Sequence, residues 1–281
     1  MEPATAVKPP VEEIPSLPNE WGAIRAGSLG VHIARSPWEI EAAQALRYRI
    51  YYGEMGGTPT EEARKLNRDF DQFDPFCDHL LVFDYDLPAG PKQVVGTYRM
   101  LRRSALPSLK QFYSEGEFDI SSIKQEQGEI LELGRSCVDA NYRNRAVMQL
   151  LWRGIAAYVA LHDVKLLFGC GSFSGTDVKP HTLSLSYLYH YHLAPLDLRA
   201  QALSERYVEM NLMPKDAIDV RQAFAALPTL IKGYLRVGSY IGQGAVIDPQ
   251  CNTIDVSIVV RTDLVADKYA QRYSAPARND E

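Results

Sequence analysis

A helix that is apolar almost all round is the feature that most constrains how this chain folds. Residues 145–161, RAVMQLLWRGIAAYVAL, carry long polar side chains only at Arg145, Gln149 and Arg153. These positions are four residues apart, so they form one narrow stripe along the helix. A helix with so little polar surface is buried, and we expect it to pack against a β-sheet.

The residues before this helix predict a strand that contains two charged side chains. Glu132 and Arg135 lie within ILELGRSCVD, residues 130–139. Side chains three apart face opposite sides of a regular strand, but a β-bulge at Gly134 would bring both to one face. The pair is either a structural salt bridge or a base with an anion-binding arginine, because ionisable groups are costly in the middle of a sheet.

The remaining pattern predicts an α/β layer with a mixed sheet. Strands are expected at residues 29–36, 79–86, 94–103, 165–172, 205–213, 245–250 and 253–260, and helices at 37–55, 181–193 and 219–238. Residues 1–27 are rich in Pro and Glu and predict a flexible tail. We expect a core over residues 28–215 and, over 216–281, a C-terminal extension packed on that core.

Charge and cysteine usage exclude several classes of protein. The formal net charge is −5, which does not suit a nucleic-acid-binding protein. The four cysteines are widely spaced and form no CxxC pair, which argues against a zinc ribbon or a disulfide scaffold. Neither a signal peptide nor an uncharged run of roughly 20 residues is visible. These features predict a reduced, cytoplasmic protein.

Charged residues upstream suggest a site for a small charged substrate. NRDFDQFDPFCD places Asp69, Asp71 and Asp74 in one polar segment that lacks the glycine and glutamate of a calcium loop. This segment is either a solvated acidic turn or a reader of a cationic substrate. Arg99 within a predicted strand and Arg47 on the first helix suit carboxylate recognition through paired hydrogen bonds.

Two further groups of residues bear on ligand binding. Arg143 and Arg145 lie at the start of the apolar helix, where unpaired N–H groups favour an anion such as a pyrophosphate. Solvated arginines at a helix start are the alternative. His190 and His192 are two residues apart and therefore do not share a helix face, so no metal site is predicted.

Several stretches, in this order, resemble the ornithine-lipid N-acyltransferases, which are bacterial GNAT-fold enzymes related to acyl-homoserine-lactone synthases. They are LRYRIYYGEM, DFDQFDPFCDHLLV, VVGTYRML, LELGRSCVDANYRNRAVMQLLWRGI and LIKGYLRVGSYIGQGAVID. The resemblance covers residues 31–263 and implies a GNAT-like, largely antiparallel sheet flanked by helices, with a C-terminal helix-plus-strands extension. It also implies transfer of a 3-hydroxyacyl group from acyl carrier protein to the α-amine of L-ornithine, giving lyso-ornithine lipid.

The resemblance implies a role for each candidate residue. Glu132 and Arg135 match a strand motif of the lactone synthases, and we expect them to be catalytic, with backbone N–H groups at Gly134 receiving the oxyanion. Less securely matched substrate-binding positions are Arg47, Asp69, Asp71, Asp74 and Arg99, with the aspartates attracting the δ-ammonium group of ornithine. No metal and no resident cofactor are expected, because the phosphopantetheine arrives on the carrier protein.

The turn before the apolar helix bears on the acyl donor. GNAT enzymes that use coenzyme A typically carry (R/Q)xxGx(G/A) there, whereas this chain has RNRAVM, with Ala146 and Met148 at the glycine positions. The departure favours a carrier-protein donor, which brings a single phosphodiester. Arg143 and Arg145 are then expected to meet the acidic carrier protein.

Two alternatives stay open from the sequence. One is a GNAT-fold acyltransferase that acts on another amine, such as glycine, serine or homoserine. The other is a non-catalytic protein that binds lipid or membrane, because LPTLIKGYLRVG places Leu227, Leu230, Ile231 and Tyr234 on one helix face with Lys232 and Arg236 one turn apart. The same helix suggests peripheral contact with the inner face of a membrane.

Overall fold

The computed structural model describes residues 24–263, which form one mixed sheet covered by helices on both faces. The strand order is β1-β2-β3-β4-β6-β7-β11-β10-β8-β5, and β9 pairs with β10. The longer ladders are antiparallel, apart from the parallel pairing of β6 with β7. The expected mixed, largely antiparallel sheet is confirmed. The strands are β1 (Ile24–Ala26), β2 (Leu29–Ile33), β3 (Asp78–Asp84), β4 (Val94–Arg102), β5 (Phe118–Asp119), β6 (Glu129–Val138), β7 (Val164–Ser174), β8 (Gln201–Ala202), β9 (Tyr207–Val208), β10 (Tyr240–Asp248) and β11 (Thr253–Arg261).

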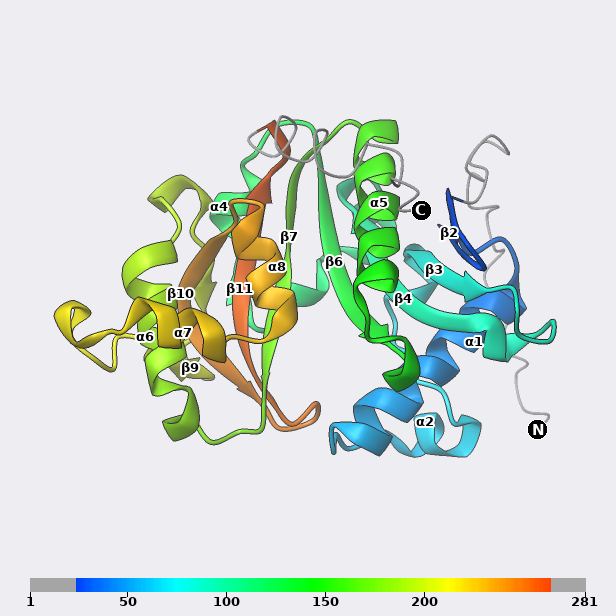
Figure 1. The fold of residues 1–281 in the computed structure, drawn as a ribbon. Helices are drawn as coiled ribbons and strands as arrows, with labels where there is room; N and C mark the ends of the chain where they lie inside the picture. Colours follow the sequence, from blue (N-terminus) through cyan, green and yellow to red (C-terminus); the bar gives the residue numbers. More distant parts are fainter. Residues whose placement is uncertain (1–23, 264–281) are drawn as a thin grey trace, which may run out of the picture.

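The helices cover the sheet in two layers (Figure 1). In β3, Leu80 and Val82 pack in the same core as α5, whereas Leu81 and Phe83 pack with α1 on the opposite face. The alternation of side chains along the strand therefore builds both cores. The helices are α1 (Pro37–Tyr48), α2 (Glu61–Leu66), α3 (Leu106–Leu109), α4 (Ser121–Lys124), α5 (Arg145–Leu161), α6 (Thr182–His192), α7 (Val220–Ala226) and α8 (Thr229–Arg236), and α1 continues as a π-helical turn over Arg49–Glu54.

The apolar helix behaves as its composition predicts. Helix α5 packs across β1 to β4, and its residues from Val147 to Tyr158 supply much of one core. Trp152 on α5 meets Tyr234 on α8 edge to face, with 4.9 Å between the ring centroids, so the two helices share one side of the sheet. Gly154 fits directly over Leu80, where an added Cβ would lie 2.8 Å from a leucine methyl group.

The ends of the chain differ from expectation. Residues 24–26 of the predicted tail form β1, which pairs with β2, while residues 1–23 lie outside the described residues. Within the predicted extension, β11 pairs with β7 over nine residue pairs and is therefore part of the central sheet. The division into core and extension stays a prediction, and its residues 264–281 also lie outside the described part of the chain.

The predicted helix 219–238 is two helices, α7 and α8, which are separated at Leu227 and Pro228. Three of the apolar residues expected to face a membrane, Leu227, Ile231 and Tyr234, are buried in the protein core. The apolar face of this amphipathic segment therefore packs into the core of the protein. Within residues 24–263, no helix is both long and apolar enough to cross a membrane.

A fork between two central strands sets up the site. The parallel ladder of β6 and β7 ends at the pair Glu132 and Phe168, although β6 runs on to Val138 and β7 to Ser174. Among the described strands, β6 beyond this point pairs with β4, and β7 pairs with β11. Figure 1 shows the two strands separating toward the lower part of the view. The facing edges of both strands beyond Glu132 are therefore not paired with each other.

The predicted β-bulge is present and lies just after Gly134. Opposite Thr97 and Arg99 of β4, the partners in β6 are Cys137 and Gly134, so β6 contains one extra residue. Arg135 absorbs the irregularity with a left-handed backbone, at φ 50°. Such a conformation is uncommon for a residue with a side chain and is typical of functional sites.

Candidate active site

A cavity of about 240 Å³ opens at the fork. Glu132, Gly134 and Arg135 line it from β6, and Arg99 lines it from β4. Cys170 and Ser172 of β7 face them across the gap. The remaining lining is contributed by residues from several elements: Tyr51, Met55, Tyr98, Leu101, Tyr113, Leu133, Ser136, Leu230, Tyr234, Asp248, Cys251, Thr253 and Asp255. Three of the predicted site residues, Glu132, Arg135 and Arg99, thus meet in one cavity.

Glu132 is buried and holds the segment that closes one side of the site. Its carboxylate accepts hydrogen bonds from the N–H groups of Tyr113 (2.9 Å) and Ser114 (2.7 Å) and from the Ser114 hydroxyl (2.5 Å). Burial raises its pKa, and the hydrogen bonds from Ser114 and Tyr113 oppose that shift. Glu132 is therefore a fixed carboxyl group whose affinity for a proton is higher than that of an exposed glutamate.

Arg135 is held among aromatic rings and carboxylates. Its guanidinium lies 5.0 Å from the ring centroid of Tyr113 and 6.0 Å from that of Tyr51. Nη2 lies 3.3 Å from Asp71, and Nε lies 3.6 Å from Asp69. Within residues 24–263, the ion pairs of Arg135 are to these aspartates and not to Glu132, so the structural salt bridge between Glu132 and Arg135 is absent.

The other charged residues form the ion network that continues from Arg135. Arg47 is fully buried and bonds to Asp69 through Nε (2.8 Å) and to Asp74 through Nη2 (2.7 Å). Arg99 bonds to Asp71 (2.7 Å) and Asp74 (3.0 Å) through Nη1. These arginines hold the pKa of Asp74 below its usual range against the opposing effect of burial.

This network corrects two expectations. Asp69, Asp71 and Asp74 are matched by Arg47, Arg99 and Arg135, so three negative charges face three positive charges. The aspartates are neither a solvated turn nor open carboxylates for a substrate ammonium group. Arg47 does not line the cavity, and its contacts make it a support for the aspartate segment.

The start of α5 is already capped by the protein. The Asn144 side chain accepts hydrogen bonds from the N–H groups of Ala146 (3.0 Å) and Val147 (3.2 Å). Arg143 and Arg145 are exposed beside this cap, and Arg143 pairs with Glu54. A pyrophosphate would have to displace the Asn144 cap to use these donors.

The two candidate histidines do not meet in one site, and Cys137 is not a reactive thiol. His190 bonds to the Met213 carbonyl (2.9 Å) and His192 to the Tyr187 hydroxyl (2.9 Å), so the two rings point to separate contacts. Burial raises the pKa of Cys137 to about 12, which keeps this thiol protonated and unsuited to be a nucleophile.

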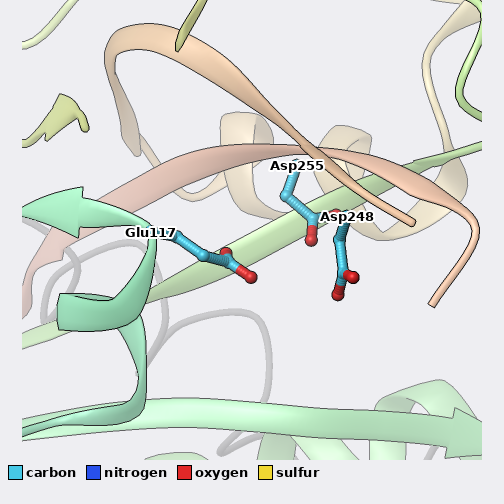
Figure 2. A group of neighbouring side chains, drawn as sticks. All are labelled: Glu117, Asp248 and Asp255. Atoms are coloured by element: carbon cyan, nitrogen blue, oxygen red, sulfur yellow. The ribbon is translucent and has the colours of Figure 1, made fainter. Parts of the chain in front are cut away.

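A second group of acids, Glu117, Asp248 and Asp255, was not predicted from the sequence. One carboxylate oxygen of each lies within 4.8 Å of the others, and all three residues are buried (Figure 2). Within residues 24–263 this is the group of carboxylates that could hold a metal ion. In the strand TIDVSIVV, Thr253, Asp255 and Ser257 alternate with apolar residues, which is the pattern of a half-exposed strand. In the structure these three residues are nevertheless only 2%, 5% and 2% exposed, so the pattern hides the buried acid.

The mixed sheet, which splays between two parallel strands and carries a bulge and a buried acid at the fork, has the GNAT-like fold of this class of acyltransferases. The acetyltransferase (GNAT) domain family matches residues 46–153, which include β3, β4, β6 and the start of α5.

The relatives of the chain identify the family. The chain is 43% identical to the L-ornithine N(alpha)-acyltransferase of Brucella abortus (strain 2308), over 90% of this chain and 91% of the relative. It is 42% identical to the protein of the same name from Agrobacterium fabrum (strain C58 / ATCC 33970), over 90% of this chain and 87% of the relative. The chain belongs to the L-ornithine N(alpha)-acyltransferase family. FeeM, an N-acyl amino acid synthase from uncultured soil microbes, is a more distant structural neighbour, with a TM-score of 0.47 and 12% identity over 86% of this chain and 94% of that one.

Proposed function

We propose that the protein transfers a 3-hydroxyacyl group from acyl carrier protein to the α-amine of L-ornithine, giving lyso-ornithine lipid. The observation that carries the proposal is the cavity at the β6–β7 fork, where Glu132, Arg99 and Arg135 meet. The names of the relatives support ornithine as the acceptor. A thioester arm that enters the fork can pair with the open edge of β6.

The reaction is aminolysis of a thioester. A free α-amine attacks the carbonyl carbon, a C–N bond forms, and collapse of the tetrahedral intermediate breaks the C–S bond and releases the pantetheine thiol. The α-amino group of a peptide has a pKa of about 8, and that of a free amino acid is higher because of the adjacent carboxylate, so the acceptor amine is mostly protonated at pH 7. A base is therefore needed to take up its proton. Glu132 lines the cavity with a raised pKa, and we assign it as the acceptor of the amine proton.

Two other groups have roles in this proposal. Arg135 binds the α-carboxylate of the acceptor, since its guanidinium lines the cavity and its position is fixed by Asp69, Asp71 and Tyr113. Backbone N–H groups of β6 at Gly134 stabilise the oxyanion. One such donor contributes roughly 2.7–4 kcal/mol to the transition state.

The start of α5 supports a carrier-protein donor over coenzyme A. The glycine-poor turn and the Asn144 cap leave few free N–H groups for a pyrophosphate. Arg143 and Arg145 are exposed at the same end of the helix and can meet an acidic carrier protein. Peripheral membrane contact stays a prediction without support from α8.

The test is an acyl-transfer assay with the purified protein. The donor is a 3-hydroxyacyl carrier protein or the matching coenzyme A thioester, and the acceptors are L-ornithine, glycine, L-serine and L-homoserine. Mass spectrometry identifies the product. We expect an ornithine conjugate from the carrier-protein donor. A conjugate with another amine would replace the acceptor but keep the reaction, and the same rate from coenzyme A would remove the donor assignment.

A further inference from the structure

The acidic cluster comprises Glu117, Asp248 and Asp255, which come from three different elements. Glu117 precedes β5, Asp248 ends β10, and Asp255 lies near the start of β11. Figure 2 shows their carboxylates converging on one space between the strands. Asp248 has a second task, because its Oδ1 accepts the N–H groups of Gln250 (2.8 Å) and Cys251 (3.2 Å) and closes the β10–β11 turn.

The acidic cluster lacks a paired cation. Within residues 24–263, no lysine, arginine or histidine nitrogen lies within 4.0 Å of a carboxylate oxygen of the three. Arg206 and Arg135 act on the cluster only electrostatically, at longer range. This contrasts with Asp69, Asp71 and Asp74, which are matched by arginines. Buried carboxylates without a partner are costly, so such a group takes up protons or binds a cation.

The pKa values follow that rule. Burial raises the pKa of Glu117 to about 7, and the nearby Asp255 adds to the shift. Burial raises the pKa of Asp255 to about 6, with a hydrogen bond from Ser172 opposing the shift and Asp248 adding to it. Both groups thus hold protons more readily than exposed carboxyls when no cation is present.

One oxygen atom in the cluster lacks a hydrogen-bond partner. Oδ1 of Asp255 is buried and has no hydrogen-bond partner in the described part of the chain. Asp255 is 5% exposed, and both Asp255 and Asp248 line the cavity at the fork. A buried acceptor without a donor, next to two further carboxylates, is suited to a group that brings a positive charge and several N–H donors.

A short chain of contacts connects the acidic cluster to the proposed reaction centre. The Cys170 thiol donates to Glu117 (3.3 Å) and lies 3.7 Å from the Ser114 hydroxyl, which donates to Glu132 (2.5 Å). One thiol and one hydroxyl therefore separate Glu132 from Glu117. A linear molecule with an amine at each end can place one amine at the fork and the other at the cluster.

We propose that Glu117, Asp248 and Asp255 bind the side-chain ammonium group of the acceptor and thereby select a diamino acid. This inference rests on the proposed function, because it assigns the second amine of ornithine to a place beside Asp248 and Asp255, which line the same cavity. The acidic cluster, and not Asp69, Asp71 and Asp74, then binds the δ-ammonium group of ornithine. A protonated amine supplies three donors and one positive charge to three carboxylates that lack both.

The test compares L-ornithine with L-norvaline, which has the same carbon chain without the δ-amine. For the wild-type protein we expect kcat/KM for ornithine to exceed that for norvaline by about 10²–10⁴-fold, since norvaline leaves the carboxylates unpaired. Asp255→Asn and Glu117→Gln are expected to reduce this ratio at least about 10-fold. Asp216→Asn, at an exposed aspartate before α7, is the matched control and keeps the wild-type ratio. Equal loss with both acceptors would overturn the proposal, since a general defect in folding or chemistry lowers both alike.

A second measurement needs no acyl donor. L-ornithine is expected to raise the melting temperature of the wild-type protein more than L-norvaline does, and this difference is expected to vanish in Asp255→Asn. If the wild-type protein acylates neither amino acid but shows this difference, the proposed function fails and the ammonium site stands. Stabilisation by Mg²⁺ or Ca²⁺ that is lost in Asp255→Asn, with no effect of ornithine, would assign the cluster to a metal ion instead.

Discussion

Glu132 of β6 and Phe168 of β7 form the last residue pair of the parallel ladder between these strands. The buried acid therefore sits where two strands stop pairing, and its carboxylate is fixed by Tyr113 and Ser114 from another segment. The next residues of β6 carry the bulge that turns Arg135 into the same cavity. The end of one ladder thus places the acid, the arginine and an open strand edge together.

Glu132→Gln tests the role of the acid. Glutamine keeps the shape but cannot accept a proton, and we expect turnover to fall by about 10²–10⁴-fold. One acceptor oxygen for Tyr113 or Ser114 is also lost, so the free energy of unfolding falls by about 1–3 kcal/mol. Steady-state kinetics and urea unfolding measure the two effects separately. Glu129→Gln, the same change at the start of β6, is the control, and wild-type turnover of Glu132→Gln would remove Glu132 from the proton transfer.

Much of the fold was predictable because its periodicities are strong. The apolar helix at 145–161 and the strands around Leu80 and Val256 lie where the pattern indicates. The break at Pro228 was missed because the apolar spacing continues across it. The place of β11 beside β7 was also missed, since strand order depends on contacts distant in sequence.

Asp74→Asn tests the ion network. Asp74 accepts hydrogen bonds from Arg47 and Arg99 in the protein interior, and loss of its charge leaves these arginines short of a counter-charge. We expect the free energy of unfolding to fall by about 3–5 kcal/mol in urea denaturation. Glu61→Gln, in the exposed pair with Lys65 (2.8 Å), is the control and should change little. A loss equal to that of the control would mean that the network does not stabilise the fold.

The site was only partly predictable from the sequence. Glu132 and Arg135 are recognisable because charges stand out within an apolar strand. Asp69 and Asp74 appeared open to substrate because their partners, Arg47 and Arg99, approach only in the folded chain. Glu117 and Asp255 gave no signal as a pair, since they are far apart in sequence and Asp255 alternates with apolar residues as surface positions do.

The double variant Arg143→Glu and Arg145→Glu tests carrier-protein binding. Reversing two exposed charges beside the start of α5 should raise the Kd for acyl carrier protein at least about 10-fold at low salt, which corresponds to about 1.4 kcal/mol. The difference from wild type should shrink as salt rises, since exposed charges are screened. Arg221→Glu, exposed on α7, is the control for a charge reversal away from this helix start. Titration calorimetry at two salt concentrations measures the change in Kd and its dependence on salt. An unchanged Kd at low salt would mean that the carrier protein binds elsewhere.

The raised pKa values of the acidic cluster predict how stability depends on pH. A carboxyl group with a higher pKa in the folded state binds more protons when folded, so the free energy of unfolding falls as pH rises through that range. Folding raises the pKa of Asp255 from 3.8 to about 6 and the pKa of Glu117 from 4.5 to about 7, so this loss of stability falls between about pH 4 and pH 7.

The comparison of wild type with Asp255→Asn isolates this effect. It is needed because burial lowers the pKa of His79 to about 4, and His79 therefore makes the protein more stable as pH rises toward 6.5. At pH 4.5 the two proteins should be similarly stable, and by pH 7 the variant should be more stable by about 1–2 kcal/mol. Urea unfolding across this range, without amino acids present, measures the difference; a constant difference would show that Asp255 does not titrate there.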